Sequence, residues 1–291
     1  MTCTHLERVA AIIWTYNPNL PIFHKVLSSV IPQVDQIIII DNASSNYSEI
    51  DKICKHYNSK IFIIRLKRNL GVEALNIAMS YAVKEGFKFL LILDQDSILL
   101  DAYLVCKMLK MFEKLKNIPV GAIHVAFKEL GGKVNYVDAR SPLAPYEIFS
   151  GTMINAQCFC KGLRIRKEFF LDQADFDFFE EMRRKGFLTL LYGKKLMWHK
   201  LGEKIRCKLP FIEYIDITYE NPNRYYYIVR NSTALLLEGK ITFYRYFVQL
   251  ISFFLALILR KRVLSALKAL GLGLIHASLG QFGMLKVTNE I

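Results

Sequence analysis

Short apolar runs alternate with longer helical patterns through the first hundred residues of the chain. Four runs rich in β-branched residues predict strands, at Val9 to Tyr16, Gln36 to Asp41, Lys60 to Leu66 and Phe89 to Asp94. The stretches between them have helical spacing of apolar residues, most clearly in GVEALNIAMSYAVKEG. Alternation of this kind predicts βαβ units and a parallel sheet that helices cover on both faces.

Polar residues follow each of the four apolar runs. They include Thr15 and Asn17 at the end of the first run, Asp41 at the end of the second, Asn69 beyond the third, and Asp94 and Asp96 at the end of the fourth. Ligands of open α/β sheets bind at the carboxyl ends of the strands. The pattern therefore predicts a single crevice lined by these polar ends.

The pattern becomes more irregular after residue 117. The segments VGAIHVAF, VNYVDA and EIFSGTMINA predict further strands, which gives a mixed but mainly parallel sheet. The acidic segment FFLDQADFDFFEEMRRKG follows, with a helix running to Lys185, and then a short strand LTLLYG and the pair Trp198 and His199. Beyond about residue 232 the chain is predicted to be helical and basic.

The C-terminal region combines apolar and basic residues without acidic ones. The chain of 291 residues has a net charge of +13, and the stretch from Gly239 to Gly280 contains six basic residues and no acidic residue. This composition favours amphipathic helices on an anionic membrane surface over a nucleic-acid interface. The apolar run from Tyr246 to Leu259 is shorter than the roughly 20 residues of a spanning helix. A solvated basic face, or a helical pair in a core or dimer, remains the alternative.

Cysteine usage and the N-terminus favour a cytoplasmic protein. The six cysteines form no CxxC pair, and this predicts reduced thiols. The start MTCTHLERVAAIIWTYNP has no cationic region before a long apolar run, so no signal peptide is expected. Glycine placement matches neither a dinucleotide fingerprint nor a P-loop, so no redox cofactor is expected.

The pair Asp94 and Asp96 is the first candidate for chemistry. Side chains two residues apart on an extended segment point the same way, so both carboxylates can converge on one cation. Hard oxygen ligands of this kind suit Mg²⁺ or Mn²⁺ bound largely through substrate phosphates. A solvated turn is the simpler alternative, and an aspartyl phosphatase is a minor one, because those enzymes carry the nucleophile on an earlier strand.

Two further groups have both a structural and a chemical interpretation. His199 is either a core imidazole or a third metal ligand. The acidic residues Asp172, Asp175 and Asp177 either complement the first turn of a helix or include a general base.

Five sequence blocks in fixed order resemble a known family across nearly the whole chain. They are AIIWTYNP, IIIIDNAS, RNLGVEALNIAM, LLILDQDS and FLDQADFDFFEEMRRKGF, followed by WHKLGE and NRYYYIVRNS. Together they resemble the inverting family-2 glycosyltransferases of the GT-A fold, and within that family the bacterial rhamnosyltransferases that use dTDP-L-rhamnose. The resemblance implies an α/β GT-A nucleotide-sugar-binding fold followed by C-terminal basic amphipathic helices.

The resemblance also assigns site residues by position. The nucleotide sugar would be bordered by Thr15, Asn17, Asp41, Asn69, Gly71, Asn76, Asp94, Arg224 and Arg230. Asp96 and His199, with Asp94 beside them, would hold the Mg²⁺ or Mn²⁺ ion that bridges the diphosphate. The base that takes the acceptor's proton would be Asp175, with Asp177 as second choice. The sequence departs from the family pattern here, because Asp177–Phe178 replaces the usual Glu–Trp pair and Glu181 stands where an arginine is common.

These observations predict an inverting, metal-dependent transferase. The expected donor is dTDP-L-rhamnose and the expected acceptor a polyprenyl-diphosphate-linked saccharide, in synthesis of a bacterial O-antigen, capsule or cell-wall glycan. Residues 1–235 would form the catalytic domain, and residues 236–291 would attach to the inner face of the plasma membrane. The alternatives are another nucleotide sugar as donor, or an inactive nucleotide-sugar-binding module on the membrane surface.

Overall fold

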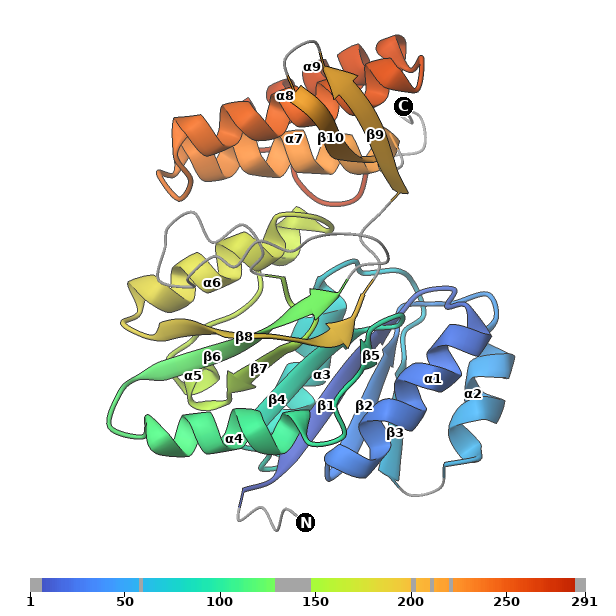
Figure 1. Ribbon diagram of the computed structural model, residues 1–291, viewed down its shortest axis with the longest axis vertical. Coiled ribbons are helices and arrows are strands. Elements are labelled where there is room, and N and C mark those ends of the chain that lie inside the picture. Colours follow the sequence, from blue (N-terminus) through green and yellow to red (C-terminus); the bar gives the residue numbers. More distant parts are fainter. Residues whose placement is uncertain are drawn as a thin grey trace. The chain divides into compact units, whose positions relative to one another are not determined.

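The protein forms two compact units (Figure 1). The computed structural model describes residues 7–57, 60–128, 148–199, 203–209, 212–219 and 222–285. Unit 1 comprises Met1–Ile165 and Phe178–Lys200, and unit 2 comprises Arg166–Asp177 and Leu201–Ile291. This division differs from the predicted boundary after residue 235, because helix α7 (Pro222–Leu237) packs with the C-terminal helices α8 and α9.

Unit 1 is built on a mixed sheet of eight strands in the order β3-β2-β1-β4-β7-β6-β8-β5. The strands are β1 (Val9–Thr15), β2 (Gln36–Asp41), β3 (Ile61–Arg65), β4 (Phe89–Asp94), β5 (Ile98–Leu99), β6 (Val120–Lys128), β7 (Thr152–Asn155) and β8 (Leu188–Trp198). Strands β3, β2, β1 and β4 run parallel, whereas β7 is antiparallel to both β4 and β6. The predicted mixed, mainly parallel sheet is confirmed.

Helices connect the parallel strands and cover the sheet on both faces. They are α1 (Leu20–Val30), α2 (Tyr47–Lys55), α3 (Glu73–Lys84), α4 (Leu104–Lys114) and the short α5 (Gln157–Cys160), and α6 (Ala174–Arg184) begins in unit 2 and ends in unit 1. In Figure 1, α1 and α4 lie in front of the sheet and α3 lies behind it.

Helix α1 illustrates how the sequence specifies these elements. The side chain of Asn19 accepts a hydrogen bond from the Ile22 N–H and so caps the helix, and a proline follows in the first turn. Its buried residues, Phe23, Val26, Leu27 and Val30, recur at helical spacing and form one face. Truncating Leu27 to alanine would cost about 2–5 kcal/mol of stability, because the side chain is fully buried.

The carboxyl ends of four strands lie side by side at one edge of the sheet. Thr15 is paired with Asp41, Asp41 with Arg65, and Trp14 with Asp94 in the parallel register. The chain runs outward from β1 through β2 to β3 and then crosses back to β4 on the other side of β1, so the strand order reverses at β1. Such a switch point is where open α/β sheets bind nucleotides.

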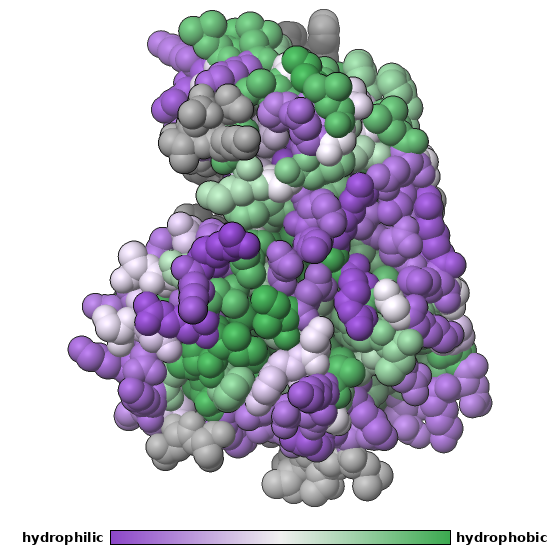
Figure 2. All heavy atoms as spheres, turned by 180° about the vertical axis from the view of Figure 1, so that it is seen from behind, coloured by the Kyte–Doolittle hydropathy of each residue, from purple (hydrophilic) through white to green (hydrophobic). Residues whose placement is uncertain are grey.

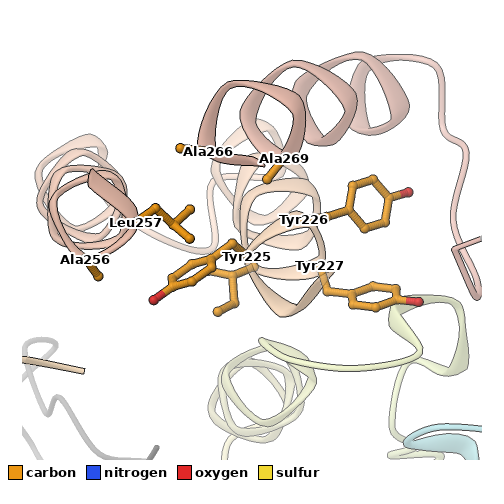
Figure 3. Packing of buried hydrophobic residues seen from close by; sticks show 8 residues of the cluster. Tyr225, Tyr226, Tyr227, Ala256, Leu257, Ala266 and Ala269 are labelled. Carbon is orange, nitrogen blue, oxygen red and sulfur yellow. The ribbon is translucent and has the colours of Figure 1, made fainter. Parts of the chain in front are cut away.

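Unit 2 contains a β-hairpin and three helices. Strands β9 (Glu203–Leu209) and β10 (Ile212–Tyr219) pair antiparallel, and the helices are α7, α8 (Phe243–Leu259) and α9 (Val263–Ser278). Figure 3 shows Leu257 of α8 pointing toward Tyr225 of α7, with Ala266 and Ala269 on the adjoining face of α9. Small residues allow close approach of α9 and α7, since a Cβ on Gly273 would meet Val229 Cγ1 at 2.7 Å.

Helices α8 and α9 leave a large apolar face exposed. The exposed side chains include Phe243, Tyr244, Phe247, Val248, Ile251, Leu255, Ile258, Leu259, Val263, Leu264, Leu267, Leu274, Ile275 and Leu279. Hydrophobic side chains are accordingly visible on the C-terminal part of the surface, at the top of Figure 2. Within the ranges described above, no helix has both the length and the hydropathy needed to cross a bilayer.

Three expectations from the sequence are corrected by the structure or are not addressed by it. The helical region begins at Pro222, not near residue 232, and the β9–β10 hairpin precedes it. Cys54, Cys158 and Cys160 are free, but Cys106 is disulfide-bonded, so the prediction of reduced thiols was wrong for this residue. The predicted strand VNYVDA lies outside the described residues.

Candidate functional site

The ends of β1 and β2 are joined by buried hydrogen bonds. Asp41 Oδ1 accepts a hydrogen bond from the Thr15 hydroxyl at 3.1 Å, and its Oδ2 accepts one from the Ser44 N–H at 3.0 Å. Thr15 and Asp41 are both fully buried. Asn17 adopts a positive φ of 48°, and its Oδ1 accepts hydrogen bonds from the backbone and hydroxyl of Ser45. These side chains fix the two loops at the switch point, and their contact with a nucleotide stays a prediction.

A second asparagine network shapes the loop after β3. The buried Asn42 donates to the Gly71 carbonyl at 3.1 Å and accepts from the Leu70 N–H at 2.8 Å. Asn69 Oδ1 accepts from the Gly71 N–H at 2.8 Å, and Gly71 adopts a φ of 59° that favours glycine. Asn42 was not among the predicted site residues, although it stands beside Asp41 in the IIIIDNAS block.

Asn76 on α3 is hydrogen-bonded to the backbone of Ile165. Its amide donates to the Ile165 carbonyl at 2.7 Å and accepts from the Ile165 N–H at 2.9 Å. Both polar groups of the side chain therefore hold the backbone of a neighbouring segment. A nucleotide contact at Asn76 stays a prediction, and it would compete with these two bonds.

Asp94, Asp96 and His199 form one cluster of ligand atoms. One oxygen from each carboxylate and one ring nitrogen all lie within 4.8 Å of one another. Asp94 Oδ2 lies 3.7 Å from His199 Nε2, and Asp96 Oδ1 lies 3.4 Å from His199 Nδ1. Ligands of a small divalent cation are separated by roughly 3 Å when the metal–oxygen distance is near 2.1 Å. The cluster therefore fits Mg²⁺ or Mn²⁺ after small adjustments of two half-buried carboxylates.

Two serines that were not predicted as site residues support this cluster. The Ser97 hydroxyl lies 2.9 Å from His199 Nδ1 and 2.6 Å from the Ser150 hydroxyl, which in turn accepts from the Asp94 N–H at 3.0 Å. If Nδ1–H donates to Ser97, the lone pair of Nε2 is left to face a cation beside Asp94. The serine network thus connects the backbone of one candidate ligand to the ring of another.

Gln95, between the two carboxylates, joins β4 to the end of β1. Its Oε1 accepts from the Tyr16 N–H at 2.7 Å, and its Nε2 donates to the Tyr16 carbonyl at 3.2 Å. This pair of bonds fixes the segment between Asp94 and Asp96 against the first loop. The DQD sequence therefore has two potential cation ligands and one residue that fixes their backbone.

Asp175 lies in the first turn of α6, within unit 2. Its Oδ1 accepts from the Phe176 N–H at 2.9 Å, and among the described residues it makes no ion pair. Although the side chain keeps partial exposure, the pKa of Asp175 is raised to about 7. Desolvation is the main cause and the charge of Asp172 adds to it, whereas the hydrogen bond from the Phe176 N–H and the charge of Arg245 oppose it. A carboxyl that titrates near neutral pH is suited to general base catalysis.

Asp177 is in a different environment one half-turn later. Its Oδ1 lies 2.6 Å from Lys240 Nζ and 4.0 Å from Arg166 Nη1, and the residue is only 3% exposed. Burial raises the pKa of Asp177, and the two cations oppose this effect. A carboxylate held by two cations and shielded from solvent is a poorer base than Asp175.

Arg224 and Arg230 on α7 contact the segment that precedes Asp175. The Arg224 guanidinium pairs with the Asp172 carboxylate, with its Nη2 at 2.5 Å from Oδ1. Arg230 is 1% exposed, and it donates to the carbonyls of Phe169 and Gly283, both at 2.8 Å. A ligand contact at Arg230 would require these internal bonds to break, and the predicted role of both arginines in nucleotide-sugar binding stays a prediction.

Comparison with known proteins identifies relatives over most of the chain. The family model described as "Glycosyl transferase family 2" matches residues 10–173. The chain is 25% identical over 251 residues to a dTDP-rhamnosyl transferase, RfbF, of Shigella flexneri, and the match covers 81% of this chain and 82% of that protein.

Solved structures resemble the fold at low sequence identity. A mannosyltransferase from Pyrobaculum calidifontis, PcManGT, in complex with GDP-Man and Mn²⁺, has a TM-score of 0.55 at 15% identity, covering 97% of this chain and 78% of its own. S. aureus TarS 1-349 in complex with UDP-GlcNAc also has a TM-score of 0.55, at 13% identity, covering 78% of this chain. The chain spans 66% of that TarS fragment, slightly less than two thirds.

Proposed function

The chain belongs to glycosyltransferase family 2 and has its GT-A type of fold, and from this membership we propose that it transfers L-rhamnose from dTDP-L-rhamnose with inversion. Membership replaces the phosphatase hypothesis for Asp94 and Asp96 and favours a catalyst over an inactive binding module. The observation that carries the proposal is the cluster of Asp94, Asp96 and His199 beside the switch point of the sheet. The similarity to a dTDP-rhamnosyl transferase supports the choice of donor.

The proposed roles follow from the chemistry of each group. Asp96 and His199, with Asp94, would hold a divalent cation, which offsets the charge of the departing diphosphate. Asp175 takes the proton from the acceptor hydroxyl, because its raised pKa leaves it able to accept a proton near pH 7. Thr15, Asn17, Asp41, Asn69 and Gly71 shape the loops that receive the nucleotide.

We further propose that the acceptor is a polyprenyl-diphosphate-linked saccharide and that the chain attaches to an anionic membrane surface. The support is the exposed apolar face of α8 and α9, with Phe243 69% and Leu264 83% exposed. Arg260, Lys261 and Arg262 are exposed at the junction of these helices. Each basic residue near an anionic surface contributes about 1 kcal/mol of attraction, in addition to burial of the apolar side chains.

A donor panel tests the catalytic proposal directly. Purified protein is incubated with nucleotide sugars that include dTDP-L-rhamnose, UDP-GlcNAc and GDP-mannose, with Mn²⁺ or Mg²⁺, and nucleoside diphosphate release is followed. Release without added acceptor measures transfer to water, and stimulation by a synthetic polyprenyl-diphosphate disaccharide tests the acceptor. Preference for dTDP-L-rhamnose is expected; faster release from another donor would overturn the donor assignment, and no release from any donor would restore the inactive-module hypothesis.

A further inference from the structure

The backbone immediately before Asp175 is strained over five residues, which we call the turn segment (residues 169–173). Phe170, Asp172 and Gln173 have positive φ values of 61°, 53° and 62°. At Phe170, ψ is −52° and the Leu171 N–H bonds to the Phe169 carbonyl at 2.7 Å, which is the rarer and more strained form of γ-turn. Strain of this kind persists only where surrounding contacts impose it, and it concentrates at functional sites.

Helix α7 supplies the contacts that impose this conformation. Asn231 Nδ2 lies within hydrogen-bond distance of the carbonyl oxygens of Phe169, Leu171 and Asp172, at 3.1, 2.7 and 2.9 Å. Arg230 Nη2 donates to the Phe169 carbonyl as well, at 2.8 Å. The carbonyls of the turn segment therefore converge on two adjacent side chains that lie some 60 residues later in the chain.

The orientation of the Asn231 amide is itself fixed. Arg230 Nε donates to Asn231 Oδ1 at 2.9 Å, which leaves the Nδ2 donors facing the turn segment. Arg230 Nη1 donates to the Tyr226 hydroxyl and the Gly283 carbonyl, so the guanidinium is held from several sides. Asn231 is fully buried.

The turn segment in turn sets the start of α6. The Gln173 carbonyl accepts the Asp177 N–H at 3.1 Å and closes the first turn of the helix that contains Asp175. Gln173 and Asp175 are only two residues apart. A change of backbone conformation at residues 170–173 would therefore move the Asp175 carboxyl.

We propose that Asn231 and Arg230, with Arg224 on Asp172, are positioning residues for the base: they hold the turn segment in its strained conformation and so place Asp175. This inference rests on the proposed function of Asp175. In this proposal Arg224 and Arg230 hold the turn segment in place and do not contact the nucleotide sugar directly. The proposal explains why a helix from the C-terminal region carries polar residues that are fully buried.

A double-mutant cycle between Asn231→Ala and Asp175→Asn tests the proposal in the full-length protein. The donor is the nucleotide sugar that the wild-type chain consumes fastest, and its nucleoside diphosphate is the binding probe. Asn231→Ala is expected to lower kcat about 100-fold, since small misplacement of a catalytic group has effects of this size, and to change the Kd of the nucleoside diphosphate less than twofold. In the Asp175→Asn background the same substitution is expected to lower kcat less than threefold, because the group that it positions is already gone.

Two further variants separate positioning from folding. Thr233→Val is the matched control, because Thr233 is buried on the same helix and its hydroxyl bonds to the Val229 carbonyl and the Tyr246 hydroxyl instead of to the carbonyls of the turn segment. It is expected to lower the Tm and leave kcat unchanged. If Asn231→Ala does not fold, Arg224→Gln replaces it in the cycle, because the Arg224 side chain is 39% exposed.

The outcomes distinguish this inference from the proposed function. If the kcat losses of Asn231→Ala and Asp175→Asn multiply in the double variant, Asn231 does not act through Asp175. A rise in the Kd of the nucleoside diphosphate together with the loss of kcat in Asn231→Ala would also overturn the positioning role. Asp175 would remain the base in both cases. Full activity of Asp175→Asn alone would overturn the base assignment and this inference with it.

Discussion

Ser97 Oγ lies 2.9 Å from His199 Nδ1, so the serine that directly follows the second carboxylate of the DQD sequence fixes the ring of the third candidate ligand. A residue next to one ligand in the chain thereby orients another ligand that follows about a hundred positions later. Hydrogen bonds to the second nitrogen of a ligating histidine determine which tautomer it adopts and how strongly it binds.

Ser97→Ala is therefore expected to weaken Mn²⁺ binding roughly 10- to 100-fold. Isothermal titration of Mn²⁺ in the presence of nucleoside diphosphate measures the effect. Ser232→Ala is the matched control, because Ser232 is also fully buried but bonds to the Ile228 carbonyl in unit 2. Equal Mn²⁺ affinity of the Ser97 variant and the wild type would show that Ser97 does not support a metal ligand.

Asp96→Asn is expected to abolish most of the metal-dependent gain in nucleoside diphosphate affinity while the fold persists, since the side chain is 35% exposed. Binding is measured in Mn²⁺ and in excess EDTA, with Asp51→Asn on α2 as a control at a similarly half-buried aspartate, whose side chain is 28% exposed. If wild type and variant bind equally well in both conditions, the cluster does not hold a cation.

Asp175→Asn is expected to lower kcat about 10²- to 10⁴-fold and to leave nucleotide affinity unchanged, because only proton removal is lost. In the wild type, kcat/KM should fall as the pH drops below about 7, the pKa to which desolvation raises Asp175. Asp177→Asn should instead lower the stability by about 1–3 kcal/mol, since Lys240 loses its closest carboxylate. If Asp177→Asn alone abolished turnover at normal stability, the base would be Asp177.

Asp172→Asn should shift the acidic limb of the kcat/KM pH profile to lower pH. The negative charge of Asp172 raises the pKa of Asp175, so its removal lowers that pKa, and the positive charge of Arg224, which Asp172 no longer compensates, acts in the same direction. The deprotonated, active form of Asp175 then persists at lower pH. Asparagine tolerates the positive φ of 53° at this position. If the acidic limb of the kcat/KM profile stays at the same pH or moves to higher pH, the charge of Asp172 does not raise the pKa of Asp175.

Leu264→Glu should weaken binding to anionic liposomes about tenfold or more, because a leucine that is 83% exposed in the protein would lose its burial in the lipid. Flotation at low and high salt measures the effect, with neutral liposomes for comparison. Leu237→Glu is the control, since Leu237 is 69% exposed but lies at the end of α7. Absence of wild-type binding to anionic liposomes at low salt would remove the proposal of membrane attachment, and a need for detergent extraction would indicate insertion.

The parallel half of the sheet could be predicted because its strands are continuous apolar runs between polar residues. Strands β2 and β4 have the predicted bounds, and β1 ends one residue earlier than predicted. The β9–β10 hairpin was missed, although KIRCKL and IEYIDITY alternate apolar and polar residues with a period of two. The alternation was overlooked because these segments adjoin a basic region that was predicted to be helical.

The candidate site could be predicted only where its residues lie together in the chain or in a family motif. Asp94, Asp96 and His199 were assigned in this way, and the structure brings them together. Ser150 could not be found from the sequence, because it reaches Ser97 only through the pairing of β7 with β4. The strained turn segment was equally hidden, since its conformation depends on Asn231, which follows some 60 residues later.

The chain passes between its two units three times, after Ile165, Asp177 and Lys200. No single cut in the sequence therefore separates the two units intact. Cutting after residue 235 would remove Leu257 and Ala266, which pack against the tyrosines of α7, and would leave that helix with its apolar side facing water. Truncated versions are thus a poor means of separating membrane attachment from catalysis, and single substitutions on the outer face of α8 and α9 are the appropriate tool.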